Sequence, residues 1–143
     1  MLMATAIDEI MPEVFRLLQE RVGMDCESFG AAGIEQAVRN RISTSGAGSP
    51  RDYLRRLVLD PDEFQELIED LVVPETWFFR DMLAFRALAG FLDAGRGLNR
   101  PVLRVLSVGC STGEEVYSLA IALREAGLTP PRCLILGTDL SQR

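Results

Sequence analysis

The stretch VLRVLSVGCSTGEE, residues 102–115, joins an apolar run to a glycine turn and the start of a helix. Residues 102–108 are mostly valine and leucine, which is typical of a buried parallel strand. A helical pattern follows over residues 114–126, and CLILGTD, residues 133–139, is a second apolar strand ending in an acid. Strand, turn, helix and strand in this order predict one right-handed β-α-β unit.

The glycine turn does not match the common nucleotide motifs. No lysine follows its second glycine, as in a Walker loop, and G-x-G-x-x-G is missing because only Gly109 and Gly113 are present. Glycine at the end of a first strand still allows a ligand to approach the backbone closely. Glu114 and Glu115 would repel a pyrophosphate there and attract an ammonium or sulfonium group. Favourable placement of acids on a helix dipole is the alternative explanation for one of them.

Asp139 lies at the end of the second predicted strand, thirty residues after Gly109. An acid at this position can bind the two hydroxyls of a ribose. A ligand that combines adenosine with a positively charged amino-acid group is S-adenosylmethionine. The residue types and their order therefore favour this cofactor over a dinucleotide.

Residues 1–73 predict a small all-α bundle. Asp8 can cap a first helix, which Gly23 would end. A second helix is predicted over residues 29–42, and the run STSGAGS at 43–49 is a flexible connection.

Two helix starts of one kind follow, because Ser49 and Asp60 each stand before a proline. Glu63 is the expected acid of a capping box with Asp60. The predicted buried positions of these two helices are Tyr53, Leu54, Leu57, Val58, Phe64, Leu67, Ile68 and Leu71.

Residues 74–81 read PETWFFRD, with three consecutive aromatic residues. Their rings must point in several directions, which favours a junction over a simple amphipathic helix. The predicted organisation is a helical domain at 1–73, a junction with a linker helix at 74–101, and an incomplete sheet domain at 102–143. The fold class is therefore α+β overall.

The composition excludes several classes of function. The 143 residues include 48% apolar and 25% charged residues, with a net charge of -6, which argues against disorder and against general attraction to nucleic acid. There is no histidine, so a His base or a His-ligated metal is excluded. Three widely spaced cysteines indicate neither disulfides nor a metal site, and no targeting or membrane segment is evident, so we expect a cytoplasmic chain.

Charge is uneven within the helical part. Residues 36–58 carry five arginines against one acid, whereas the rest of that part is strongly acidic. A solvated helix face is one explanation, and a docking patch for an acidic partner is the other. The arginines are Arg39, Arg41, Arg51, Arg55 and Arg56.

Three motifs after a helical domain, PETWFFRD, SVGCSTGEEVYSLAIAL and GTDLS, closely resemble the CheR-type chemotaxis receptor methyltransferases. Membership implies a Rossmann-like domain that transfers methyl groups from S-adenosylmethionine to glutamate side chains of bacterial chemoreceptors. With proline at position 74, the motif PETWFFRD resembles the form found in the branch of the family that often carries tetratricopeptide repeats. The family's helical domain meets acidic receptor helices with a basic helix, which supports a docking role for the arginines.

The resemblance also implies roles for individual residues. Arg80 would pair with the cofactor carboxylate, and Thr76 would line the same pocket. Gly109 or its neighbour, with one of Glu114 or Glu115, would meet the amino group. These carboxylates are expected to bind rather than to act as bases, since a glutamate substrate is already nucleophilic.

Two further implications follow. Asp139 would hold the ribose hydroxyls, and the three aromatics would anchor the junction so that Arg80 reaches across it, with plain core packing expected for at least two rings.

The sequence stops after one β-α-β unit, which leaves a sheet edge unpaired. We therefore expect a fragment without activity of its own. A non-catalytic receptor-binding or regulatory module with a vestigial cofactor site is the alternative. A homodimer that completes the sheet is a further possibility, and a nucleic-acid surface on the arginines is disfavoured by the overall acidity.

Overall fold

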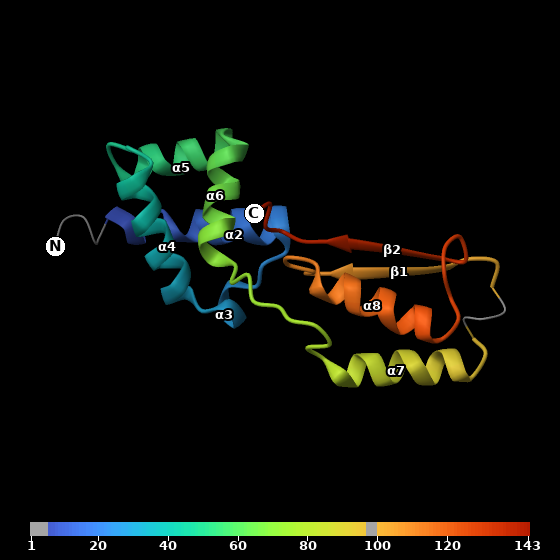
Figure 1. Ribbon diagram of the computed structural model, residues 1–143. Helices are drawn as coiled ribbons and strands as arrows, with labels where there is room; N and C mark the ends of the chain where they lie inside the picture. The colour runs from blue at the N-terminus through green and yellow to red at the C-terminus, as the bar shows by residue number, and fades with distance from the viewer. Residues whose placement is uncertain (1–5, 97–99) are drawn as a thin grey trace. The chain divides into compact units, whose positions relative to one another are not determined.

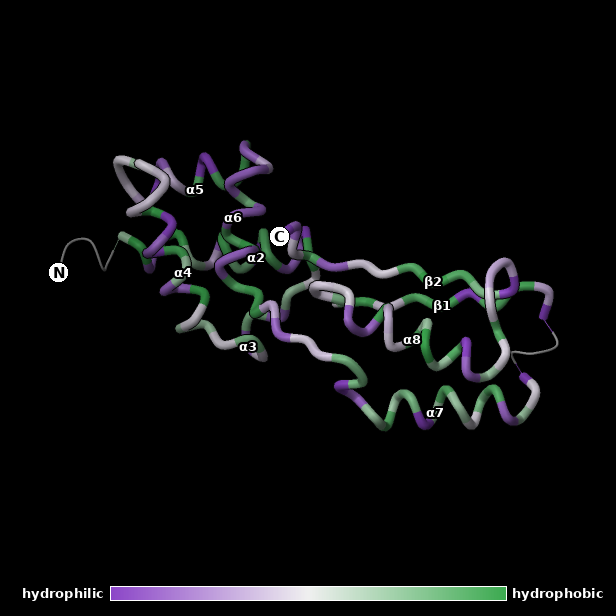
Figure 2. The backbone as a smooth tube through the Cα atoms, viewed as in Figure 1, coloured by the Kyte–Doolittle hydropathy of each residue, from purple (hydrophilic) through white to green (hydrophobic). Residues whose placement is uncertain are grey.

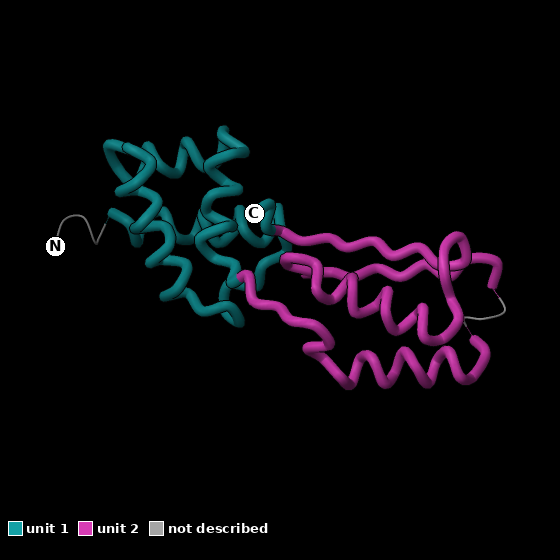
Figure 3. The backbone as a smooth tube through the Cα atoms, in the orientation of Figure 1, with its two compact units in different colours: residues 1–73, 141–143 teal, residues 74–140 magenta. Residues whose placement is uncertain are grey.

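The computed structural model describes residues 6–96 and 100–143 (Figure 1). The chain divides into two compact units (Figure 3). The first consists of residues up to 73 together with 141–143, and the second of residues 74–140. Helices make up the first unit, and the second combines helices with a parallel sheet, which confirms the α+β class with an all-α N-terminal part.

The helical unit follows the predicted order, with one addition. Its helices are α2 (Met11–Val22), α3 (Cys26–Phe29), α4 (Ala31–Thr44), α5 (Pro50–Leu59) and α6 (Pro61–Leu71). The short helix α3 was not predicted; Asp25 caps it by accepting the N–H of Glu27 at 3.2 Å. Helix α4 corresponds to the helix expected at 29–42, shifted by two residues at each end.

The predicted cap of the first long helix is wrong. Residues 6–8 are themselves helical, and α2 begins at Met11 with Pro12 in its first turn. Proline lacks an N–H and is tolerated at the first helical turn, so Pro12 rather than Asp8 fixes this start. Gly23 ends α2 as predicted, in the left-handed region with φ 69°.

The caps of α5 and α6 are confirmed. The Ser49 hydroxyl accepts the N–H three residues later at 3.2 Å, and the Asp60 carboxylate accepts two N–H groups of the first turn of α6. Each cap satisfies N–H groups that have no partner within the helix.

Apolar side chains from these helices form one core. Its fully buried members include Val14, Leu18, Ile34, Val38, Tyr53, Leu57 and Leu67. Most predicted core positions of α5 and α6 are buried, but Val58 is 39% exposed and belongs to the surface. Burial raises the pKa of the Tyr53 hydroxyl above its ordinary value, and the nearby Glu63 carboxylate adds to this.

Glu63 does not complete a capping box. The N–H of Asp60 is donated to the Arg56 carbonyl at 2.8 Å, and the Glu63 carboxylate instead binds Arg41. Nε and Nη2 of Arg41 donate to the two Glu63 oxygens at 2.9 and 3.1 Å. The Glu63 side chain is 2% exposed and that of Arg41 15% exposed, so a bidentate ion pair joins α4 to α6 at the edge of the core.

The second unit contains α7 (Met82–Asp93), β1 (Leu103–Val108), α8 (Glu114–Glu125) and β2 (Cys133–Thr138). The strands are parallel, with Leu103 opposite Cys133 and Val108 opposite Thr138. This confirms the predicted strand, turn, helix and strand. Asp81 caps α7 by accepting the N–H groups two and three residues later.

The two faces of the sheet differ, although both strands are largely apolar (Figure 2). Leu103, Val105 and Ile135 pack into a small core with Leu123 of α8 and Leu92 of α7. The alternate residues are exposed: Leu106, Val108, Leu134 and Leu136. Within the described residues the sheet has two strands, so completion of its edge by a second copy of the chain stays a prediction.

Gly137 of β2 lies against the glycine turn and the start of α8. A Cβ at this position would stand 2.6 Å from Cγ2 of Val116 and 3.0 Å from Sγ of Cys110. Real Cβ atoms essentially never show the first distance, and the second is tighter than most real contacts, so a side chain at residue 137 would force Val116 and Cys110 to shift.

Arg41→Ala should destabilise the helical unit by up to about 3–5 kcal/mol, because it removes the bidentate partner of the buried Glu63 carboxylate and leaves it only the more distant Arg56, at 3.6 Å. Arg39→Ala is the matched control on the same helix. Arg39 forms a partly exposed ion pair with Glu35, one helical turn earlier in α4. Loss of this pair should lower the free energy of unfolding by about 0.3–0.5 kcal/mol. Urea unfolding followed by far-UV circular dichroism measures both.

The double variant Arg41→Met, Glu63→Leu separates loss of the ion pair from loss of packing. It should recover most of the stability, since apolar residues of similar volume often replace a buried pair without cost. Equal losses for Arg41→Ala and Arg39→Ala would contradict the structural role of this pair.

Gly137→Ala should push the glycine turn away from β2 and destabilise the second unit by about 1–3 kcal/mol, as overpacking does. Gly90→Ala on α7 is the control, because no atom lies within 4 Å of a Cβ there and alanine favours a helix. Thermal unfolding compares the two variants, and amide chemical shifts at 109–113 report movement of the turn. An unchanged turn in Gly137→Ala would contradict the close contact.

Candidate functional site

The carboxyl ends of β1 and β2 meet at one edge of the parallel sheet, where the glycine turn begins. The N–H groups of Gly109 and Cys110 both donate to the Thr138 carbonyl, at 2.8 and 3.1 Å. Ligands of open α/β sheets bind outside this edge. The turn is thereby fixed to the last residue of β2, directly before Asp139.

Three residues of the turn have positive φ: Gly109 at 78°, Ser111 at 47° and Gly113 at 102°. Glycine is suited to two of these positions, whereas Ser111 is strained. The Ser111 N–H donates to Oδ2 of Asp139 at 2.7 Å, so the strained residue holds the carboxylate against the turn. The two features that the sequence predicted separately, the glycine turn and Asp139, are therefore in contact.

Glu114 and Glu115 begin α8 and lie half-buried. They have different partners. Oγ1 of Thr112 donates to Glu114 at 2.6 Å within the turn, while the buried Ser107 hydroxyl of β1 donates to Glu115 at 2.7 Å. The Glu114 carboxylate is thus bound within the turn, and the Glu115 carboxylate is bound to β1.

Arg80 is held by its own segment. It donates to the Glu75 carbonyl, lies 3.9 Å from the Glu75 carboxylate and places its guanidinium 4.6 Å from the centre of the Trp77 ring. An arginine over an indole face is stabilised by a cation–π interaction. Thr76, between them, is half-buried.

The three consecutive aromatics have separate environments. Trp77 contacts Arg80, Phe78 lines a surface groove with Tyr117 and Ile121, and Phe79 packs edge-on against Phe85 of α7 at 5.0 Å. Trp77 and Phe78 are 50% and 53% exposed, so core packing for at least two of the rings is wrong. Their different directions agree with a junction rather than an amphipathic helix.

Sequence reasoning missed two serines of this site. Ser107 and Ser118 are both buried polar residues, at 2% and 0% exposure. Ser118 accepts the N–H of Phe79 at 2.9 Å and so connects α8 to the aromatic segment. A serine inside an otherwise apolar helical face was the available signal, because a buried hydroxyl requires a partner.

The predicted arginine patch is divided by its partners. Arg39 binds Glu35, and Arg41 is enclosed in its pair with Glu63. Arg56 donates to the Ser45 carbonyl at 2.8 Å.

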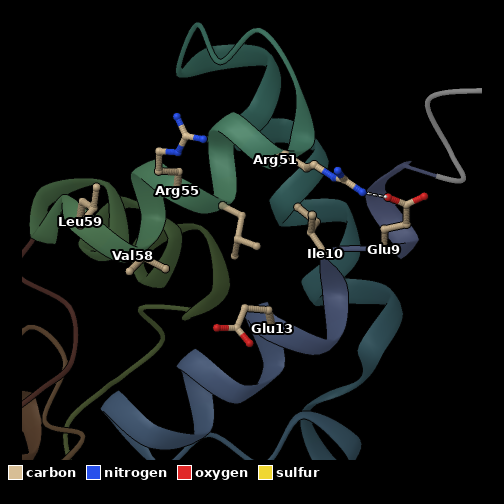
Figure 4. Close-up of a pocket in the computed structure, with 8 residues that line it drawn as sticks. Glu9, Ile10, Glu13, Arg51, Arg55, Val58 and Leu59 are labelled. Carbon is tan, nitrogen blue, oxygen red and sulfur yellow. Dashed lines mark hydrogen bonds and ion pairs between the residues drawn. The ribbon is translucent and has the colours of Figure 1, made fainter.

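Arg51 and Arg55 remain on the surface of α5. Arg51 pairs with Glu9 at 3.0 Å, while Arg55 has no ion-pair partner among the described residues. Both line a groove of about 480 Å³ (Figure 4). Its other residues are Glu9, Ile10, Glu13, Leu54, Val58 and Leu59.

Within residues 6–96 and 100–143, no group of cysteines and acids could hold a metal ion. In the same ranges, every helix is too short or too polar to cross a membrane.

Comparison with known proteins adds family profiles for both parts of the chain. Residues 11–72 match the all-alpha domain of CheR methyltransferases, and residues 74–143 match their SAM binding domain.

Relatives agree with these profiles. The "probable biofilm formation methyltransferase WspC" of Pseudomonas putida is 50% identical over 130 residues, and that of Pseudomonas aeruginosa is 44% identical over 135. These alignments cover 89% and 90% of this chain but 30% and 31% of the relatives, so the chain spans about a third of their length. A chemotaxis protein methyltransferase of Salmonella typhimurium is 29% identical over 130 residues, which is 89% of this chain and 44% of that protein. The helical unit and the glycine-turn unit, each matched by its own profile, place the chain in the CheR methyltransferase family.

Proposed function

We propose that this chain belongs to an enzyme of the cytoplasm that methylates glutamate side chains of a chemoreceptor-type protein with S-adenosylmethionine. The observation that carries the proposal is the arrangement at the edge of the sheet. Asp139 is bound to the glycine turn through Ser111, and two carboxylates begin the next helix beside it. Receptor methylation in a biofilm-related system is the finer form of the proposal, because the two WspC relatives carry that name.

The residues present fit this cofactor. A nucleoside with an ammonium and a sulfonium group requires acidic partners and a backbone that it can approach, and the turn supplies both. Asp139 would bind the ribose hydroxyls, and Gly109 with Glu114 or Glu115 the amino group. The Ser111 hydroxyl is buried without a hydrogen-bond partner among the described residues, so the hydroxyl itself is available to bind a polar group of the ligand.

Arg80 would bind the carboxylate end of the cofactor, with Thr76 lining the same pocket. Its present partner, the Glu75 carboxylate, is exposed and 3.9 Å away, so a carboxylate on a ligand can replace it at little cost. The indole of Trp77 limits the orientations of the guanidinium before any ligand binds.

Bound S-adenosylmethionine supplies a methyl group that is already activated by the sulfonium. The substrate carboxylate is nucleophilic at neutral pH, so the protein needs to align the two and exclude water rather than to provide a strong base. This agrees with the absence of histidine from the sequence. Glu114 and Glu115 therefore act as binding groups in the proposal.

Arg51 and Arg55 are the predicted docking arginines that best suit an acidic receptor helix. Both are exposed on α5 and line the groove together with Val58 and Leu59 (Figure 4), and Leu54 adds to its apolar lining. An amphipathic helix is recognised by such a combination of apolar contact and flanking charge. Arg39, Arg41 and Arg56 contribute less, because their side chains are less exposed than that of Arg51, whose own pair with Glu9 lies in solvent.

A non-catalytic receptor-binding module is the second candidate. The exposed apolar face of β1 and β2 favours it, since a parallel sheet that binds cofactor is normally covered on both faces. Cofactor binding by this chain separates the two candidates.

S-adenosylhomocysteine should bind the 143-residue chain saturably in calorimetric titration. Arg80→Ala and Asp139→Ala should each weaken it by about tenfold to a hundredfold, because each removes a charged hydrogen-bond partner. Arg104→Ala and Asp93→Ala are controls for charge, as both residues are exposed on other surfaces of the same unit. A folded chain that binds no S-adenosylhomocysteine would favour the receptor-binding module.

Receptor docking predicts a salt-dependent interaction with a synthetic acidic amphipathic helix. The double variant Arg51→Glu, Arg55→Glu should weaken this binding by about tenfold or more, since it opposes like charges. Arg124→Glu, on α8, is the charge control. Fluorescence anisotropy of the labelled helix gives both affinities, and equal affinities for the two variants would exclude the groove as the docking surface.

A further inference from the structure

A buried serine lies in the middle of α8. Ser118 is fully buried, and its hydroxyl makes two hydrogen bonds. It donates to the Glu114 carbonyl one turn earlier at 2.6 Å and accepts the N–H of Phe79 at 2.9 Å. A hydroxyl has one proton to donate, so the direction of both bonds is determined by chemistry. The serine thus joins two segments that are 39 residues apart in the sequence.

Phe79 has an unusual backbone. Its φ is 56°, in the left-handed region that residues with a side chain rarely adopt. Two contacts hold it there: its ring packs against Phe85 of α7, and its N–H is bound by Ser118 of α8. A strained conformation persists only where the surroundings determine it, so these contacts maintain the turn.

The two ends of this connection are adjacent to two parts of the proposed cofactor site. Phe79 directly precedes Arg80, whose guanidinium lies over Trp77. Ser118 lies one helical turn after Glu114, and its hydroxyl binds the carbonyl of that residue. Arg80 and the acids of α8 come from segments far apart in the sequence, and the bond from Phe79 to Ser118 joins these segments directly.

We propose that Ser118 is a positioning residue, which fixes the turn at 77–80 to α8 so that Arg80 and Glu114 keep a constant separation for one cofactor molecule. The inference rests on the proposed function. Ser118 itself touches no cofactor in this proposal, because its side chain is fully buried and its one proton is donated to the Glu114 carbonyl. Its effect on binding passes through Arg80.

A purely structural serine would give a different result from a positioning one. Loss of a structural hydrogen bond lowers stability without changing a site that is correctly formed in the folded chain. Loss of a positioning bond changes ligand affinity and the environment of Arg80 while the chain stays folded. The chain offers a local probe, because Trp77 is its single tryptophan and contacts Arg80.

The experiment uses three substitutions at this position in the 143-residue chain. Ser118→Ala removes the hydroxyl, Ser118→Cys keeps a side chain of similar size with a weak acceptor, and Ser118→Thr keeps the hydroxyl, which can still bind the carbonyl four residues earlier. Ile135→Val on β2 is the control for stability, since it trims the core of the same unit away from the turn.

Calorimetry with S-adenosylhomocysteine should show about tenfold weaker binding for Ser118→Ala and Ser118→Cys. Ser118→Thr should restore affinity, and Ile135→Val should leave it unchanged. Amide hydrogen exchange at Phe79 should accelerate in the alanine variant, and the emission of Trp77 should shift. Both of these readouts are independent of the cofactor.

Each alternative result has a definite meaning. Faster exchange at Phe79 with unchanged affinity would leave the bond in place but overturn its positioning role. Unchanged exchange in Ser118→Ala would show that the bond does not hold Phe79, which also overturns the proposal. A folded wild-type chain that binds no S-adenosylhomocysteine would remove the proposed function and the positioning role together, whereas failure confined to the variants concerns Ser118 alone.

Discussion

Parallel pairing of β1 with β2 is the constraint on which the candidate site depends. It brings the ends of both strands to one edge, where the Thr138 carbonyl accepts the N–H groups of Gly109 and Cys110. Asp139 follows directly, and its carboxylate accepts the Ser111 N–H. The close contact at Gly137 adds a steric condition, because a Cβ there would press on the Val116 and Cys110 side chains. Pairing, hydrogen bonding and sterics therefore select the same arrangement.

The helical unit depends on a different kind of interaction. Its core is apolar, but one ion pair, between Arg41 and Glu63, is nearly enclosed at its edge. Replacing both charges of such a pair by apolar residues is often neutral, whereas removing one of them is destabilising. The pair fixes the relation of α4 to α6 by two directed bonds, and an apolar contact would leave that relation looser.

The segment PETWFFRD contains both a proposed cofactor-binding residue, Arg80, and a strained residue, Phe79. Three aromatic rings in sequence cannot share one face, and each has a separate neighbour in the structure. The resulting turn requires a left-handed Phe79, and Ser118 of α8 supplies the compensating hydrogen bond. Strained residues of this sort persist near functional sites because the surrounding contacts determine them. Ser111, at the glycine turn, is the second example in the same unit.

The sequence by itself determined the order of the longer helices and of both strands, the α+β class, the caps at Ser49 and Asp60, and the residue types at the carboxyl edge of the sheet. These features depend on local rules of periodicity, capping and turn chemistry, which act between near neighbours. Only the tertiary structure separated Arg41, which is enclosed, from Arg55, which is exposed, although both lie in one basic run. It also assigned Glu63 to an ion pair rather than to a cap and gave Ser118 its partner 39 residues away. Those outcomes depend on which side chains meet across the fold, and no local pattern encodes such contacts.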